Sequence, residues 1–189
     1  MTLADGIRIW FINLYVLNVA VFLILAMRFR PKLSAIEKKH GPLPTPGALV
    51  TWGIPLVVLL TTVGEIPERW LAVRIAGLGL TVYNVAMQVW SLPALGRFFV
   101  PGAAVFQDHQ LVTSGAFRFV RHPIYSAHVA LWLGAALGTL NWLLLALWPF
   151  YVLSIVLVPI RQEERLLREK FGAAYDAYAA RTGPLFPKL

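Results

Sequence analysis

Cysteine is absent from this sequence. Without it the chain has no disulfide bond, no thiolate nucleophile and no cysteine ligand for a metal. Histidine is scarce as well: the four histidines lack the close spacing that ligands on one helix face would have. We therefore expect no metal site.

Charged residues are also few. Only 14% of the residues are charged, whereas 58% are hydrophobic and the mean hydropathy is +0.67. A soluble domain of 189 residues could not bury so much apolar surface, so we expect lipid to surround much of the chain. The length suits one compact domain over residues 1–189. The first apolar stretch, residues 7–27, is too long for the core of a signal peptide, so we expect it to be retained.

Long apolar runs predict an all-α integral membrane protein with about five transmembrane helices and no Rossmann domain. Pro93 should end the third span. The last two spans follow each other almost without a loop, which predicts an antiparallel helical hairpin. Apolar residues at helical spacing among charges then predict a cytoplasmic amphipathic helix over residues 161–180. The expected spans are 7–27, 48–63, 70–92, 124–140 and 142–160.

The basic residues orient these spans. The net charge is +8, and with an outside N-terminus 14 of the 17 lysines and arginines fall on the cytoplasmic side. The exceptions are Arg8, Arg69 and Arg74. The positive-inside rule therefore predicts an outside N-terminus and a cytoplasmic C-terminus, and it explains the basic excess without a nucleic acid partner. Two polar segments, 94–123 and 161–189, then share one side of the membrane and can meet.

The most polar interior stretch, residues 109–125, directly precedes the fourth span. Pro123 biases His122 away from helical geometry and suits the first turn of a helix. The free N–H groups and partial positive charge of that turn would favour an anionic group such as a carboxylate. Alternatively, Arg118, Arg121 and His122 only anchor the span at the membrane surface.

A second polar cluster follows the last span and contains Arg161, Glu163 and Glu164. Carboxylates so near a membrane are costly unless they are paired or bind a ligand. These two could hold the hydroxyls of a ribose or an ammonium group. Alternatively they form only helix-surface pairs such as Glu164–Arg168, each worth ~0.2–0.5 kcal/mol.

Polar residues also occur inside the third span, where Thr81, Asn84 and Gln88 share one helix face. They either form hydrogen bonds between helices or line a substrate cavity. The spacing leaves both alternatives open.

The run His-x-Leu-Val-Thr-Ser-Gly-x-Phe-x-x-x-Arg-His-Pro-x-Tyr over residues 109–125 resembles the cofactor motif of the isoprenylcysteine carboxyl methyltransferases. The tail from Glu163 to Tyr178 resembles the C-terminal signature of the same family, which is related to phospholipid methyltransferases. The likeness covers about the last 85 residues. It implies an S-adenosylmethionine-binding membrane enzyme whose cofactor segments are residues 102–125 and 161–180.

The resemblance assigns cofactor contacts residue by residue. Phe117 stands where relatives usually have tyrosine, and Ala127 stands where they often have glycine. Pro159 occupies the position of an arginine that helps the eukaryotic enzymes to bind prenylcysteine. The contacts expected from the motif are His109, Gln110, Leu111, Val112, Phe117, His122, Pro123, Ile124 and Tyr125, with Glu163 closing the pocket.

We therefore expect methyl transfer from S-adenosylmethionine to a lipid-like or prenyl acceptor within the bilayer. Arg161 would orient a carboxylate acceptor, whereas Glu164 would act as the base for an amine acceptor. One alternative is an NADPH-dependent membrane reductase of the sterol or steroid type, because those enzymes have a similar C-terminal hairpin. The other is a membrane scaffold without catalytic activity. Neither the acceptor nor the oligomeric state follows from the sequence.

Overall fold

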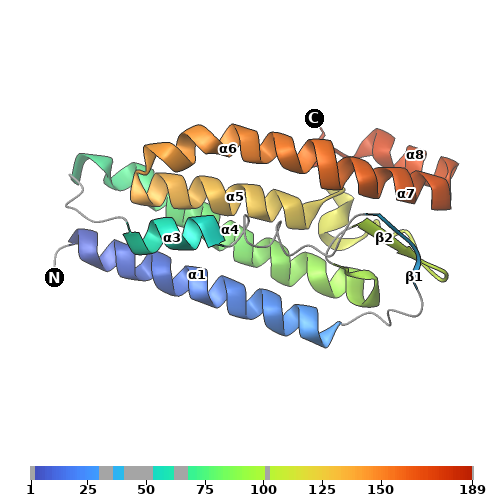
Figure 1. Ribbon diagram of the computed structural model, residues 1–189, viewed down its shortest axis with the longest axis horizontal. Helices are drawn as coiled ribbons and strands as arrows, with labels where there is room; N and C mark the ends of the chain where they lie inside the picture. The colour runs from blue at the N-terminus through green and yellow to red at the C-terminus, as the bar shows by residue number, and fades with distance from the viewer. Residues whose placement is uncertain (1–2, 30–35, 41–52, 62–67, 101–102, 189) are drawn as a thin grey trace.

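The computed structural model describes residues 3–29, 36–40, 53–61, 68–100 and 103–188, and these are mostly helical (Figure 1). The elements in chain order are α1 (Leu3–Arg28), β1 (Ile36–His40), α3 (Ile54–Thr61), η3 (Glu68–Trp70), α4 (Leu71–Leu95), η4 (Gly96–Phe98), β2 (Ala103–Phe106), η5 (Gly115–Arg118), α5 (Pro123–Thr139), α6 (Trp142–Ile155), the π-helical turn η6 (Val156–Ile160), α7 (Arg161–Phe171) and α8 (Ala173–Arg181).

Four helices, α1, α4, α5 and α6, form an elongated bundle (Figure 1). Helix α5 packs against both α4 and α6 and runs in the opposite direction to them. The strands and helices α7 and α8 gather at one end of the bundle, where α4 and α6 end and α5 begins. This end, which we call the polar cap, holds both polar segments of the sequence.

Three of the described helices are long and apolar enough to cross a membrane: Ile9–Arg28, Leu71–Phe98 and Trp142–Phe171. The third runs from α6 through η6 into α7, and its apolar part ends at Ile160. Those first 19 residues span roughly 28 Å, close to the ~30 Å of a hydrocarbon core. One hydrocarbon core would therefore be spanned before the chain reaches Arg161.

The predicted count of five spans is not confirmed. Helix α5 has 17 residues, and α3 has only 8, which is roughly 12 Å of helix and too short to cross a bilayer. The rest of the predicted second span, residues 48–52 and 62–63, lies outside the described residues. The end predicted for the third span was also wrong, because α4 continues past Pro93 to Leu95. A proline in the last turn removes one donor without stopping the helix.

Small residues bring α4 and α5 into backbone contact. A Cβ placed on Gly77 would lie 2.6 Å from the backbone N of Gly138 and 2.7 Å from the carbonyl oxygen of Gly134. Arg74 donates a hydrogen bond of 3.0 Å from Nε to the carbonyl oxygen of Gly138. Close approach through small residues is a usual way for membrane helices to associate, and here it fixes the position of α5.

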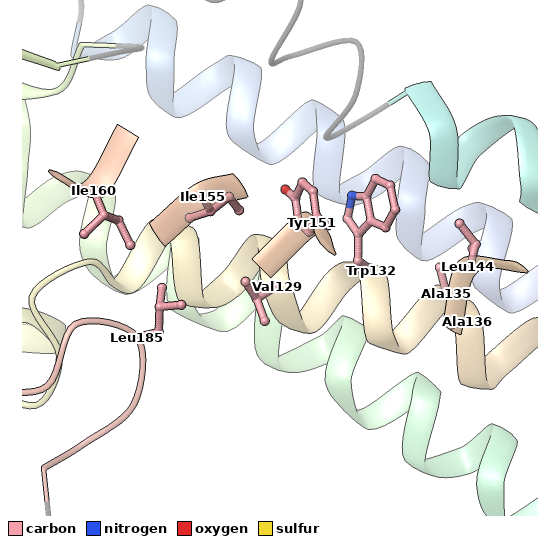
Figure 2. Packing of buried hydrophobic residues seen from close by; sticks show 9 residues of the cluster. All are labelled: Val129, Trp132, Ala135, Ala136, Leu144, Tyr151, Ile155, Ile160 and Leu185. Atoms are coloured by element: carbon pink, nitrogen blue, oxygen red, sulfur yellow. The ribbon is translucent and has the colours of Figure 1, made fainter. Parts of the chain in front are cut away.

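The predicted hairpin of the last two helices is present. Leu140 adopts a left-handed conformation with φ 49°, and Asn141 caps α6 by accepting a 2.9 Å hydrogen bond from the backbone N of Leu144. Figure 2 shows the core between the two helices, where the rings of Trp132 and Tyr151 stack 4.2 Å apart. Leu185 from the C-terminal tail packs into the same core and is 3% exposed.

The all-α prediction was incomplete, because β1 and β2 form a two-stranded antiparallel sheet. The ends of α1 and α4 lie near each other, so the segments that follow them can pair through backbone hydrogen bonds. The single amphipathic helix predicted for residues 161–180 was also wrong. It is divided into α7 and α8 at Gly172, where φ is +51°, a conformation that glycine adopts at little cost.

Candidate active site

Side chains of the two polar segments meet where α5 and α7 begin. Arg121, His122 and Tyr125, at the start of α5, all contact Glu163 or Glu164 in the first turn of α7. The two segments are about 40 residues apart in the chain, and only the packing of the hairpin brings them together. These five residues form the candidate site.

The backbone at the start of α5 is held by the C-terminal tail. The N–H of Arg121 donates to the carbonyl oxygen of Gly183 at 2.9 Å, and the N–H of His122 donates to that of Pro184 at 3.0 Å. His122 then caps the helix in a non-helical conformation, and Pro123 occupies the first helical position, as predicted. Nothing in the tail's composition had suggested this support, and the sequence analysis missed it.

Arg121 and Glu164 form the best-connected ion pair of the site. Nε and a terminal nitrogen of Arg121 each lie 2.9 Å from Oε1 of Glu164, and the two side chains are 12% and 13% exposed. Arg121 also donates to the carbonyl oxygens of Ala179 and Thr182, which fastens α8 to the site. The sequence analysis placed Arg121 in the polar segment, with a membrane anchor as the alternative, and did not include it among the expected cofactor contacts. Its position directly before His122 and Pro123 could have indicated that it belongs to the site.

Glu164 is consequently a weak base. Burial raises the pKa of its carboxyl group, but the hydrogen bonds and positive charges of His122 and Arg121 outweigh burial and lower the pKa to about 2. Arg168 lies 3.5 Å from the other carboxylate oxygen, so the predicted helix-surface pair is present as well. Glu164 therefore remains ionised and committed to cationic partners near neutral pH.

His122 lies between two carboxylates. Its Nδ1 is 3.3 Å from Oε2 of Glu163, and its Nε2 is 3.3 Å from Oε1 of Glu164. Carboxylates only accept hydrogen bonds, so both contacts are satisfied when the ring is protonated on both nitrogens. Burial lowers the pKa of His122, but the hydrogen bonds and charges of the two glutamates outweigh burial and raise it above its ordinary value. The ring therefore binds its proton more tightly than an unperturbed imidazole does.

Glu163 is the more accessible of the two glutamates. Its Oε1 accepts a 2.8 Å hydrogen bond from the hydroxyl of Tyr125, and its side chain is 24% exposed. A carboxylate has about four acceptor positions, and the contacts with Tyr125 and His122 use two of them. Glu163 is thus oriented from two sides and can still accept hydrogen bonds.

His109 occupies an aromatic niche in the polar cap. Its ring stacks on Phe98 at 4.7 Å, and the rings of Phe106 and Phe171 lie edge-on at 5.7 Å each. Burial, followed by the charge of Lys170, lowers the pKa of His109 to about 4, so the ring is neutral at pH 7. The ring contact with Phe171, the last residue of α7, connects His109 to that helix.

The remaining predicted site residues differ in exposure. Phe117 is buried, and its carbonyl oxygen accepts a 2.7 Å hydrogen bond from the hydroxyl of Tyr178. No described contact connects the stretch from Gln110 to Val112 with Glu163. Gln110 and Arg161 are exposed, Leu111, Val112 and Ile124 are half-buried, and Pro123 is buried.

The polar face of α4 is buried inside the bundle. Gln88 donates a 3.1 Å hydrogen bond to Oδ1 of Asn84, and Thr81 donates one of 3.1 Å to the carbonyl oxygen of Gly77. Both bonds lie within the helix. Nδ2 of Asn84 and Oε1 of Gln88 have no partner among the described residues. Neither alternative for this face, helix pairing or a cavity wall, is settled by these contacts.

Comparison with known proteins gives a match to one protein family and matches to curated relatives. The model of the phospholipid methyltransferase family matches residues 72–174, just over half of the chain. A probable protein-S-isoprenylcysteine O-methyltransferase of Oryza sativa subsp. indica is 30% identical over 122 residues, which are 61% of this chain and 61% of that protein. The nickel-cobalt-cadmium resistance protein NccN of Alcaligenes xylosoxydans xylosoxydans is 27% identical over 143 residues, 74% of this chain and 62% of that protein.

The matches confirm the resemblance that the two motifs predicted. The aligned region covers less than two thirds of the length of each relative. Among the described residues, no group of three His, Asp or Glu side chains is arranged to hold a metal ion.

Proposed function

We propose that this chain, which belongs to the phospholipid methyltransferase family, transfers a methyl group from S-adenosylmethionine to a lipid-like acceptor in the membrane. The observation that carries the proposal is the hydrogen-bonded group of Tyr125, Glu163 and His122 at the boundary between apolar bundle and polar cap. A water-soluble cofactor and a lipid acceptor can both reach such a boundary. In this proposal the polar cap is cytoplasmic and the N-terminus is outside.

The residues present fit the amino-acid part of S-adenosylmethionine. That part carries one ammonium and one carboxylate group. Glu163 has free acceptor positions for the ammonium, and the first turn of α5 offers backbone N–H groups and a partial positive charge for the carboxylate. The first turn of α7 can therefore bind the ammonium group, and the first turn of α5 can bind the carboxylate.

When bound, the cofactor supplies a methyl group that its sulfonium already activates. The chain then needs to position the acceptor for an in-line approach and to exclude water, and positioning alone can contribute several kcal/mol. Phe117 and Tyr125 are the aromatic residues of the motif that can favour a nearby positive charge. His122 orients Glu163 through the 3.3 Å contact between Nδ1 and Oε2.

The acid–base properties of the site favour an acceptor that needs no strong base. Glu164, with its pKa near 2, takes up a proton poorly and serves chiefly to hold Arg121 and His122. Arg161 is exposed where the apolar part of the last span ends, and we propose that it orients the acceptor's polar group. The rice relative is named as a probable protein-S-isoprenylcysteine O-methyltransferase, and we propose for this chain the broader class of lipid-like or prenyl acceptors.

Ligand-induced stabilisation of the detergent-purified protein tests the proposal. A ligand at 100 times its Kd stabilises the folded state by about 2.7 kcal/mol. We expect S-adenosylhomocysteine to raise the melting temperature of the wild type and of Glu169→Gln, an exposed control on the same helix. The rise should vanish in Glu163→Gln. Stabilisation by NADPH alone would instead indicate a reductase, and stabilisation by neither ligand would indicate a scaffold.

A further inference from the structure

A half-open cavity lies on the polar cap between η5 and α8. Thr113, Arg118, Tyr178 and Arg181 line a cavity of about 410 Å³. Cavities of roughly 300–1,000 Å³ are typical of small-molecule sites. The lining shares no residue with the group of Tyr125, Glu163 and His122.

Among the residues that the structure describes, the two arginines of this cavity have no acidic partner, unlike Arg97, Arg121 and Arg168. Arg97, Arg121 and Arg168 each lie within 4 Å of a carboxylate oxygen. Among the described residues no carboxylate pairs with Arg118 or Arg181, and the four lining residues include no acid. The cavity therefore combines two uncompensated positive charges with a threonine hydroxyl.

Tyr178 forms the inner wall of the cavity. Its hydroxyl is the donor in the 2.7 Å hydrogen bond to the carbonyl oxygen of Phe117. Burial raises the pKa of Tyr178 to about 12, while the nearby charges of Arg121 and Arg181 act in the opposite direction. The guanidinium groups of Arg121 and Arg181 therefore both lie near Tyr178. An anion between Arg118 and Arg181 would also draw η5 and α8 together and reinforce the Tyr178 hydrogen bond.

Exposed aromatic residues place this cavity near the membrane boundary. Phe119 follows Arg118 directly, and its ring lies 5.9 Å from that of Trp90 near the cap end of α4. Both side chains are 50% exposed. Tryptophan side chains of membrane helices concentrate at the level of the lipid headgroups. Arg118 therefore lies next in sequence to a residue whose ring is close to a tryptophan expected at that level.

We propose that this cavity binds the phosphodiester of an anionic membrane phospholipid. Guanidinium groups suit phosphate because they donate paired hydrogen bonds to its oxygens. The lipid is an anchor that holds α8 and η5 against the membrane surface, and it is distinct from the methyl acceptor. The inference does not depend on the proposed methyl transfer.

Thermal melting in detergent with three additives tests this site. The additives are dioleoylphosphatidylglycerol, dioleoylglycerol, which has the same chains without phosphate, and inorganic phosphate. We expect phosphatidylglycerol to stabilise the wild type and dioleoylglycerol to have no effect. The double variant Arg118→Gln/Arg181→Gln should bind phosphatidylglycerol about tenfold or more weakly, while Arg165→Gln, an exposed arginine outside the cavity, should behave as the wild type.

Three results would overturn the assignment. One is an affinity for phosphatidylglycerol in the double variant within about twofold of the wild type. Another is equal stabilisation by dioleoylglycerol, and the last is stabilisation by inorganic phosphate but not by phosphatidylglycerol. Because both arginines are exposed, we expect the double variant to fold. A response of this variant to S-adenosylhomocysteine would show separately that the first site is intact.

Discussion

The hydroxyl of Tyr125 donates a 2.8 Å hydrogen bond to Oε1 of Glu163 and so joins the first turn of α5 to the first turn of α7. Between these two turns the chain forms the whole α5–α6 hairpin. The bond therefore reports whether the hairpin closes correctly at the polar cap. It also fixes the direction of the carboxylate that we assign to the cofactor.

Replacing Tyr125 with phenylalanine should weaken cofactor binding more than its effect on stability explains. The variant loses one hydrogen bond to a charged group, worth about 1.5–3 kcal/mol, and Glu163 loses its orientation. We expect the affinity for S-adenosylhomocysteine to fall about tenfold in calorimetric titration.

Tyr83→Phe is the matched control for this variant. The hydroxyl of Tyr83 also connects two helices, through a 3.0 Å hydrogen bond with Ser126, but it does not touch Glu163. This variant should lose stability and retain its cofactor affinity. An equal loss of affinity in both tyrosine variants would show that general loosening, and not the orientation of Glu163, is responsible.

Glu164→Gln should be strongly destabilising. It leaves the largely buried guanidinium of Arg121 without its carboxylate, and breaking a buried pair costs about 3–5 kcal/mol. Asp176→Asn breaks an exposed pair with Arg168, 3.1 Å in length, and should cost less than about 1 kcal/mol. Denaturant unfolding in detergent compares the two variants. Similar losses would mean that the Arg121–Glu164 pair is no more important than a surface contact.

The pH dependence of stability should have two limbs. The pKa of Glu164 is about 2 in the folded chain and near 4.5 when unperturbed, so its contribution is present above pH 4.5 and is lost as the pH falls toward 2. The pKa of His122 is raised above 6.5, so its contribution is complete below pH 6.5 and is lost as the pH rises through the folded pKa.

Melting temperature should therefore be highest at about pH 5–6. His122→Gln should flatten the alkaline limb. It should also shrink the acid limb, because Glu164 then keeps Arg121 but loses the hydrogen bond and charge of His122 that help to lower its pKa. Melting curves between pH 3 and pH 9 measure both. An unchanged alkaline limb in His122→Gln would assign that limb to another group.

Two glycines on α4 offer a paired test of helix packing. Gly77→Ala would place a methyl group 2.6 Å from the backbone of Gly138, whereas a Cβ on Gly79 has nothing within 4 Å. Overpacking of this kind costs about 1–3 kcal/mol. Gly79→Ala should instead stabilise the helix by up to about 1 kcal/mol. If thermal unfolding shows the same sign for both, the close contact of α4 and α5 is wrong.

The sequence predicted the features that depend on local chemistry. The long apolar runs marked α1, α4 and α6, and Pro123 marked the first turn of α5. The predicted contact between the polar segments also appears, through Glu163 and Glu164. The helices and the first turn of α5 follow from residue type and spacing. The contact between the segments was predicted because the basic residues place both segments on one side of the membrane.

Features that depend on distant neighbours could not be predicted in the same way. The sheet requires Ile36 to find Phe106 across 70 positions, and its register follows from how the helices before it pack. The apolar spacing continues through Gly172, so only its backbone conformation reveals the break between α7 and α8. Likewise, the carbonyl oxygen of Gly183 accepts a hydrogen bond from the backbone N–H of Arg121. A bond between backbone groups cannot be predicted from the pattern of side chains.

Transfer of a labelled methyl group tests the central claim most directly. The protein in vesicles made from its host's lipid extract would be incubated with S-adenosylmethionine carrying a tritiated methyl group, and the lipids would then be extracted and counted. We predict label in the lipid fraction for the wild type and for Glu169→Gln, and a loss of about a hundredfold or more, or roughly 2.7 kcal/mol of barrier, for Glu163→Gln. Equal labelling with Glu163→Gln, or no labelling of lipid by a wild-type protein that binds S-adenosylhomocysteine, would contradict the account.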